Sequence, residues 1–253
     1  MPVLGVIPAR LGSTRLARKP LQLLGGEPLV VRVLERVRQV PGIAEVVVAT
    51  DADEVRRVVE RAGGRVAMTS LLHQSGTERV AEVIERPEFA SFDLVVNIQG
   101  DEPFLPVDAV QGSVERVRAG DDIGTAAVPL PTDQADDPAR VKVVVDHAGR
   151  ALYFSRARIP FQRDRGPTVP PPPYWQHLGV YAYTRDALRR WVGAPATMLE
   201  DTERLEQLRA LYLGIRIGVA LLPRPAMPGI DTPDDLAAAE RHWIAQATGS
   251  ISR

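Results

Sequence analysis

The first half of the chain alternates short apolar runs with longer segments of helical periodicity. Leu29, Val33 and Val37 recur every four residues with arginine and glutamate between them, which is typical of a helix with one buried face. The predicted strands are 3–7, 46–49, 65–68 and 94–98, and the predicted helices lie at about 28–40 and 53–62. Strands that alternate with helices in this way predict βαβ units and a largely parallel sheet.

This alternation changes near residue 140. The stretch from Val141 to Ser155 predicts a β-hairpin that turns around 147–149, and we take it as the start of an inserted β-rich subregion at about 140–185. We expect Tyr181 and Tyr183 to lie on opposite faces of a strand. The other predicted elements are a helix capped by Ser75, an exposed proline-dense loop at 167–173, a helix at 199–213, a strand at 215–222 and a last helix capped by Thr232.

Length and composition narrow the class of protein. The chain has 253 residues, 45% of them hydrophobic, which fits one α/β domain over residues 1–253 with an insertion. A formal net charge of −1 favours a nucleotide over a nucleic acid as partner. The chain has no cysteine and four histidines, which argues against zinc. We find no signal-peptide pattern and no membrane-spanning run, and therefore expect a soluble, cytoplasmic protein without membrane insertion.

The loop after the first strand is cationic and contains glycine. It carries Arg10, Arg15 and Lys19, and such a loop at the end of a strand is suited to holding a polyphosphate. It matches neither the P-loop nor the dinucleotide-binding glycine pattern, and an ordinary arginine-rich surface loop is the alternative. Only Lys19 and Lys142 are lysines among 31 basic residues, so Lys19 suggests a site where a compact ammonium fits better than a guanidinium.

Two aspartates follow buried segments and lie beside turn-forming residues. Asp101 comes after the predicted strand at 94–98, and Asp231 precedes the last helix. Ligands of open α/β sheets bind beyond the carboxyl ends of strands, so we expect Asp101 to lie near the cationic loop. Each aspartate alone could be a turn or helix-cap residue. Together with a triphosphate, they would suit Mg²⁺, which prefers oxygen ligands.

Nine motifs, in order along nearly the whole chain, resemble the 3-deoxy-manno-octulosonate cytidylyltransferases, also called CMP-Kdo synthetases. They are Ile7–Leu16 with Lys19–Leu21, Ala49–Asp51, Ser75–Arg79, Asn97–Pro103, Val141–Val144, Ala151–Arg156, His177–Tyr183, Leu205–Arg209 and Ile230–Leu236. The resemblance implies a Rossmann-like nucleotide-diphospho-sugar transferase fold with a mostly parallel mixed sheet. It also implies a homodimer and a role in lipopolysaccharide-type synthesis.

The implied reaction is attack of the anomeric hydroxyl of Kdo on the α-phosphorus of CTP, giving CMP-Kdo and pyrophosphate. The resemblance assigns Arg10, Ser13, Thr14, Arg15 and Lys19 to the triphosphate, Asp101 and Asp231 to Mg²⁺, Arg79 and Gln99 to the junction of nucleotide and sugar, and Arg156, His177, Tyr181, Glu206 and Gln207 to the sugar acid. Lys19, Arg15 and Asp101 are the expected catalytic residues.

The sequence leaves the roles of several sugar-site residues open. His177 could be a general base or a donor to sugar hydroxyls, of which we favour the donor, and Arg156 could instead tie the hairpin to its own domain. We expect only one of Glu206 and Gln207 to reach deep into the sugar pocket, because neighbours on a helix splay apart by about 100°.

The chain departs from the family pattern at three positions and leaves two alternative functions. Ala17 and Arg158 replace prolines, and Glu78 replaces an aspartate. Arg158 lies two residues from Arg156, so another acidic sugar, such as a sialic acid or an amino-Kdo, is one alternative substrate. A noncatalytic nucleotide-binding relative is the other alternative.

Overall fold

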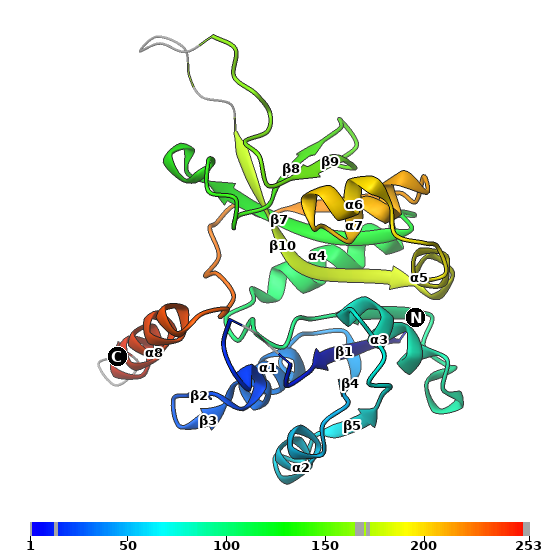
Figure 1. Cartoon of the computed structure of the whole chain (residues 1–253), viewed down its shortest axis with the longest axis vertical. Coiled ribbons are helices and arrows are strands. Elements are labelled where there is room, and N and C mark those ends of the chain that lie inside the picture. Colours follow the sequence, from blue (N-terminus) through cyan, green and yellow to red (C-terminus); the bar gives the residue numbers. More distant parts are fainter. Residues whose placement is uncertain (1, 13–14, 165–169, 171–172, 250–253) are drawn as a thin grey trace. The chain divides into compact units, whose positions relative to one another are not determined.

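The chain divides into two units in the computed structural model, which describes residues 2–12, 15–164, 170 and 173–249 (Figure 1). One unit comprises Met1–Val107 and Met227–Arg253, and the other comprises Asp108–Ala226. The predicted loop at 167–173 lies outside the described residues except for its positions 170 and 173. Among the described residues, we find no helix that combines the length and the hydropathy of a membrane span.

The first unit contains a parallel sheet. Strand β1 pairs with β4 on one side and β6 on the other, and β4 also pairs with β5, all in parallel. The strands are β1 (Val3–Ala9), β4 (Ile43–Thr50), β5 (Arg65–Met68) and β6 (Leu94–Asn97), with a short hairpin of β2 (Leu23–Leu24) and β3 (Glu27–Pro28). The helices are α1 (Leu29–Arg38), α2 (Asp53–Arg61), α3 (Gly76–Ile84) and α8 (Pro233–Gly249), with 3-10 turns at Lys19–Leu21 and Pro87–Phe89.

Burial explains why these segments take these forms. Val6 and Ile7 of β1 are fully buried, as expected for a central parallel strand covered on both faces. The apolar positions predicted for the first helix, among them Leu29 and Val33, are buried along α1 as well. The predicted βαβ alternation is therefore confirmed in this unit.

The second unit has a mixed sheet. Strand β7 pairs with β10 in antiparallel and with β11 in parallel, while β8 pairs in antiparallel with β9 and β10. The strands are β7 (Ile123–Leu130), β8 (Lys142–Val145), β9 (Ala151–Ser155), β10 (Tyr174–Thr184) and β11 (Ile217–Leu221). The helices are α4 (Val107–Arg118), α5 (Arg185–Val192), α6 (Met198–Glu203) and α7 (Gln207–Tyr212), with a 3-10 turn at Thr132–Gln134. The predicted hairpin is confirmed as β8 and β9, and the predicted α/β class with a mostly parallel mixed sheet is confirmed for the chain.

Two local predictions are wrong. The helix predicted at 199–213 is two short helices, because Arg204 takes a left-handed conformation (φ 52°) and ends α6. Tyr181 and Tyr183 share a face of β10 and stack with ring centroids 5.9 Å apart, because residues two apart on a strand point the same way. Both tyrosines are buried.

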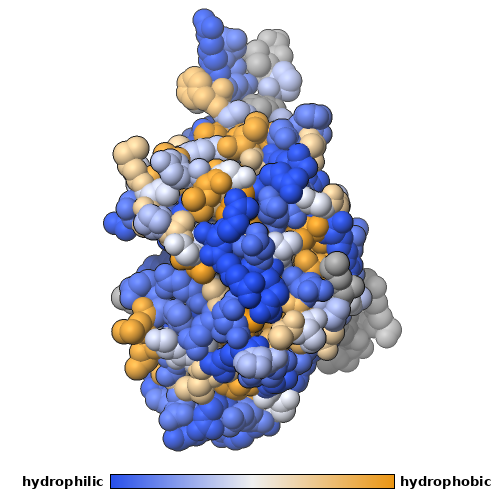
Figure 2. All heavy atoms as spheres, turned by 90° about the vertical axis from the view of Figure 1, so that its right-hand side faces the viewer, coloured by the Kyte–Doolittle hydropathy of each residue, from blue (hydrophilic) through white to orange (hydrophobic). Residues whose placement is uncertain are grey.

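One face of the molecule is largely polar. The face drawn in Figure 2 is mainly hydrophilic, with apolar atoms in scattered groups, as expected for a chain with 25% charged residues.

Candidate active site

Lys19 brings together the two aspartates that the sequence singled out. Its Nζ donates to Asp101 Oδ2 at 2.5 Å and to Asp231 Oδ1 at 2.7 Å. Lys19 lies in the 3-10 turn after the cationic loop, Asp101 follows β6, and Asp231 precedes α8. All three belong to the first unit, so the predicted convergence of distant segments is found within one compact part of the chain.

Backbone contacts hold this cluster in place. The Ile230 N–H donates to the Asp101 carbonyl at 2.9 Å and so ties the two acidic segments together. Gly100 allows the end of β6 to approach β1, because a Cβ there would lie 2.9 Å from the Pro8 carbonyl oxygen. The carboxyl ends of β1 and β6 are thus adjacent, as the sequence analysis expected for Lys19 and Asp101.

The electrostatics of the cluster favour a charged lysine. Burial alone would lower the pKa of Lys19, but the attraction and hydrogen bonds of Asp101, and then of Asp231, outweigh it and raise the pKa above its ordinary value. The ammonium side chain is 15% exposed. Lys19 is therefore a fixed positive charge at neutral pH, aimed at the place where the two carboxylates meet.

Two arginines of the same loop lie at this end of the unit. Arg15 Nη2 donates to Asp231 Oδ1 at 2.9 Å, and its side chain is 66% exposed, so the guanidinium is accessible to a ligand. Arg10 is exposed and donates to the Gln74 carbonyl at 3.2 Å. Ser13 and Thr14, also expected at the triphosphate, lie outside the described residues.

The donor set fits Mg²⁺ when a triphosphate completes it. Asp101 and Asp231 each place a carboxylate oxygen within hydrogen-bond reach of Lys19 Nζ, so the two carboxylates face the same point. Over the described ranges, no group of three or more Asp, Glu or His side chains is arranged to hold a metal. Mg²⁺ commonly takes one or two carboxylates and completes its shell with phosphate oxygens and water.

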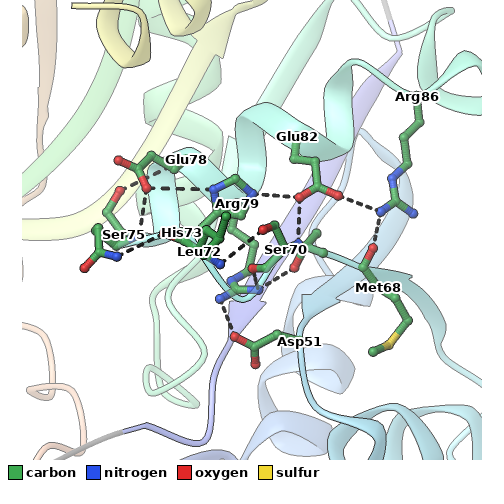
Figure 3. Close-up of polar contacts among 12 residues, drawn as sticks. Asp51, Met68, Ser70, Leu72, His73, Ser75, Glu78, Arg79, Glu82 and Arg86 are labelled. Atoms are coloured by element: carbon green, nitrogen blue, oxygen red, sulfur yellow. Dashed lines mark hydrogen bonds and ion pairs between the residues drawn. The ribbon is translucent and has the colours of Figure 1, made fainter. Parts of the chain in front are cut away.

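Arg79, expected near the nucleotide, makes its contacts inside the protein. It lies on α3, is 2% exposed, and donates to Asp51 Oδ2 at 2.8 Å as well as to Thr69 Oγ1 and the Ser70 carbonyl (Figure 3). This geometry favours a positioning role that fixes the end of β4 against α3. Gln99, the other residue expected at that junction, is partly exposed directly after β6 and Ile98.

Arg156 is likewise anchored by backbone carbonyls. Its guanidinium donates to the carbonyls of Glu203 at 2.8 Å, Pro138 at 2.9 Å and Arg204 at 3.3 Å. The contacts of Arg156 match the alternative reading, in which it ties the hairpin to the surrounding unit. Its side chain remains part of the second unit, together with all the other residues expected to bind the sugar acid.

Two residues that contact the Arg156 backbone were given no role in the sequence analysis. Lys142 is fully buried and donates to the carbonyls of Asp137 and Arg156, and burial lowers its pKa. Glu203 accepts from the Ser155 hydroxyl at 2.6 Å and from the Arg156 N–H at 2.9 Å. The rarity of lysine was a usable signal for Lys142. No sequence signal marked Glu203, because it lies in a helix that looked continuous.

The remaining sugar-site candidates lie on β10 and at the start of α7. His177 and Tyr181 are neighbours on β10, with ring centroids 5.3 Å apart. Gln207 is buried, and Glu206 is partly exposed. One member of this pair is thus buried and the other is not, as expected from their different directions on a helix, and their contact with a sugar stays a prediction.

Two of the residues that depart from the family pattern have defined contacts in the structure. Arg158 donates to the Tyr174 hydroxyl at 2.8 Å and to Asp136 at 3.0 Å, and its guanidinium lies 4.8 Å from the Tyr174 ring centroid. It is therefore committed to partners other than the expected sugar residues. Glu78 donates its N–H to Ser75 Oγ at 3.2 Å and accepts from the Gln74 N–H, which confirms the helix-capping role of Ser75.

Comparisons with known proteins agree with this geometry. A family model described as cytidylyltransferase matches residues 4–217. A 3-deoxy-manno-octulosonate cytidylyltransferase of Gemmatimonas aurantiaca is 56% identical over 245 residues, which cover 96% of this chain and 95% of that protein.

Solved structures give the same result. The structure of CMP:2-keto-3-deoxy-manno-octonic acid synthetase complexed with CTP matches with a TM-score of 0.89 and 38% identity, covering 98% of this chain and 100% of that one. A 4-diphosphocytidyl-2C-methyl-D-erythritol synthase from Anaerococcus prevotii shares the fold, with a TM-score of 0.59 at 15% identity and 95% of each chain covered. The chain therefore belongs to the cytidylyltransferase family, and within it to the 3-deoxy-manno-octulosonate cytidylyltransferases.

Proposed function

We infer that this chain transfers CMP from CTP to the anomeric hydroxyl of Kdo and releases pyrophosphate. The observation that carries this inference is the contact of Lys19 with both Asp101 and Asp231, in a chain of this family. Displacement at phosphorus asks a protein mainly to position the reactants and to neutralise charge on phosphate oxygens.

We assign the residues of the first unit to the nucleotide. Lys19, Arg15 and Arg10 would neutralise the triphosphate, and Ser13 and Thr14 would donate to it. Asp101 and Asp231 would hold Mg²⁺, which when bound supplies charge neutralisation on the phosphate oxygens. Gln99 would contact the substrates where they join, and Arg79 would keep β4 and α3 in register beside them.

We assign the sugar acid to residues of the second unit. His177, Tyr181, Glu206 and Gln207 would bind it, while Arg156 either pairs with its carboxylate or holds the hairpin that carries these groups. In this proposal both units act as one nucleotidyltransferase domain over residues 1–253. The subregion at about 140–185 would bind the sugar acid and form the dimer interface.

A coupled assay tests the reaction. We expect pyrophosphate release from CTP only when Kdo and Mg²⁺ are both present, and slower release with sialic acid or amino-Kdo. Faster release with either of those acids would reassign the substrate. Binding of CTP without pyrophosphate release from any 2-keto sugar acid would instead support the noncatalytic alternative.

We also propose a cytoplasmic homodimer that makes CMP-Kdo for lipopolysaccharide-type synthesis. The subregion exposes large apolar side chains that a partner subunit could cover: Leu152 is 62% exposed and Phe161 is 74% exposed.

We expect Leu152→Glu to shift the protein from dimer to monomer in light scattering after size-exclusion chromatography. The matched control is Leu72→Glu in the first unit, where Leu72 is 83% exposed and dimer formation should persist. A dimer that survives Leu152→Glu would place the interface elsewhere.

A further inference from the structure

A buried threonine contacts the ring of His177. Thr125 lies on β7, is fully buried, and places its Oγ1 3.0 Å from His177 Nε2. The same oxygen lies 2.7 Å from the Val180 carbonyl oxygen and 3.3 Å from the Leu178 carbonyl oxygen. The Thr125 hydroxyl thus contacts two carbonyl oxygens, which can only accept a hydrogen bond, and one imidazole nitrogen, which can either donate or accept.

An irregularity in the pairing of β10 with β7 creates this arrangement. Leu178 pairs with Ala126 and Tyr181 pairs with Thr125, so Gly179 and Val180 are extra residues on β10. Such a bulge removes carbonyls from the regular ladder and re-aims nearby side chains. Here the carbonyl oxygens of Leu178 and Val180 contact the Thr125 hydroxyl instead.

The proton positions follow from the contacts. A threonine hydroxyl has one proton, and a carbonyl oxygen can only accept. An oxygen–oxygen distance of 2.7 Å is that of a hydrogen bond, so the Thr125 proton goes to the Val180 carbonyl. Thr125 can then only accept at its third contact, and His177 Nε2 must carry a proton. On a neutral ring, Nδ1 then has a free lone pair.

We propose that Thr125 is a positioning residue that fixes His177 as the Nε2–H tautomer, so that Nδ1 accepts a hydrogen bond from a hydroxyl of the sugar acid. This inference rests on the proposed function for the identity of the ligand, but not for the tautomer. Within the described residues, Nδ1 has no hydrogen-bond partner, and His177 as a residue is partly exposed.

The surroundings of the ring keep it neutral. The Phe154 and Tyr181 rings pack against the imidazole, and burial lowers the pKa of His177 to about 3. A ring with so low a pKa accepts a hydrogen bond without removing the proton. The structure therefore favours His177 as a hydrogen-bond acceptor. The sequence analysis had considered it as a donor or as a general base.

Nitrogen NMR on the ¹⁵N-histidine-labelled protein tests the tautomer without substrate. We expect His177 to show Nε2 as a protonated nitrogen and Nδ1 as an unprotonated one at every pH from about 5 to 8. The spectrum of His177→Gln identifies the signal among the four histidines. A protonated Nδ1, a mixture of tautomers, or titration of the ring in this range would overturn the proposal.

Two substitutions of Thr125 test the positioning role. Thr125→Val keeps the shape but removes the hydroxyl, and we expect the fixed Nε2–H signal to be lost and the KM for Kdo to rise about tenfold, with the KM for CTP unchanged. Thr125→Ser keeps the hydroxyl and should retain both wild-type values. A Thr125→Val protein with the wild-type tautomer and KM would refute the proposal. If Kdo is no substrate at all, the proposed function fails, while the spectrum still decides the tautomer.

Discussion

Replacing Lys19 with methionine should lower kcat/KM for CTP by at least about 10²–10³, because one preorganised donor to developing phosphate charge is typically worth that much. Two carboxylates, at 2.5 Å and 2.7 Å, hold the lysine ammonium in place before any nucleotide binds. The measurement is steady-state pyrophosphate release at saturating Kdo and Mg²⁺.

Lys19→Arg should also be impaired, although it keeps the charge. In the wild type, the single nitrogen Nζ of Lys19 contacts both aspartates, and the lysine side chain is only 15% exposed. A planar guanidinium is larger, and its N–H donors point in fixed directions, so it would not reproduce both contacts. We expect Lys19→Arg to remain well below the wild-type rate. A wild-type rate for this variant would show that any cation suffices.

A matched control separates the local effect from a general loss of positive charge. Arg61 is exposed at the end of α2, so Arg61→Met removes one charge from the same unit without touching the cluster. This control should keep the wild-type kcat/KM. Near-normal turnover of Lys19→Met would remove Lys19 from the active residues.

The proximity of Lys19 and Asp101 could be predicted because it depends on sheet topology. The apolar runs of β1 and β6 are strong local signals, and parallel strands bring their carboxyl ends to one edge. The surroundings of Arg79 and Arg158 could not be predicted in this way. Their partners Asp51 and Asp136 lie 22 or more residues away, on segments whose packing no local pattern describes.

The conformation at Arg204 shows a second limit of sequence reasoning. Many helices stop at glycine or proline, and the segment 199–213 contains neither, so periodicity predicted one helix. The capping box of Thr197 and Glu200 and the left-handed Arg204 define a shorter helix instead. The bulge in β10 likewise has no sequence signal except Gly179. This bulge determines the hydrogen bonds of His177.

Asp101→Asn should also lower kcat by at least about 10²–10³, but for a different reason. The asparagine keeps an oxygen near Lys19 and loses the negative charge that Mg²⁺ favours. We therefore expect half-maximal activity to require more Mg²⁺ than in the wild type. The measurement is a Mg²⁺ titration of pyrophosphate release at fixed CTP and Kdo.

The shape of that titration distinguishes a metal ligand from a phosphate-binding cation. Lys19→Met should be slow at every Mg²⁺ concentration without a need for more metal, whereas Asp101→Asn should regain part of its rate as Mg²⁺ rises. Asp108→Asn, an exposed aspartate in the first turn of α4, is the matched control and should follow the wild-type curve. If Asp101→Asn were slow with an unchanged Mg²⁺ requirement, the carboxylate would serve to orient Lys19, and the metal would have to be held by other groups.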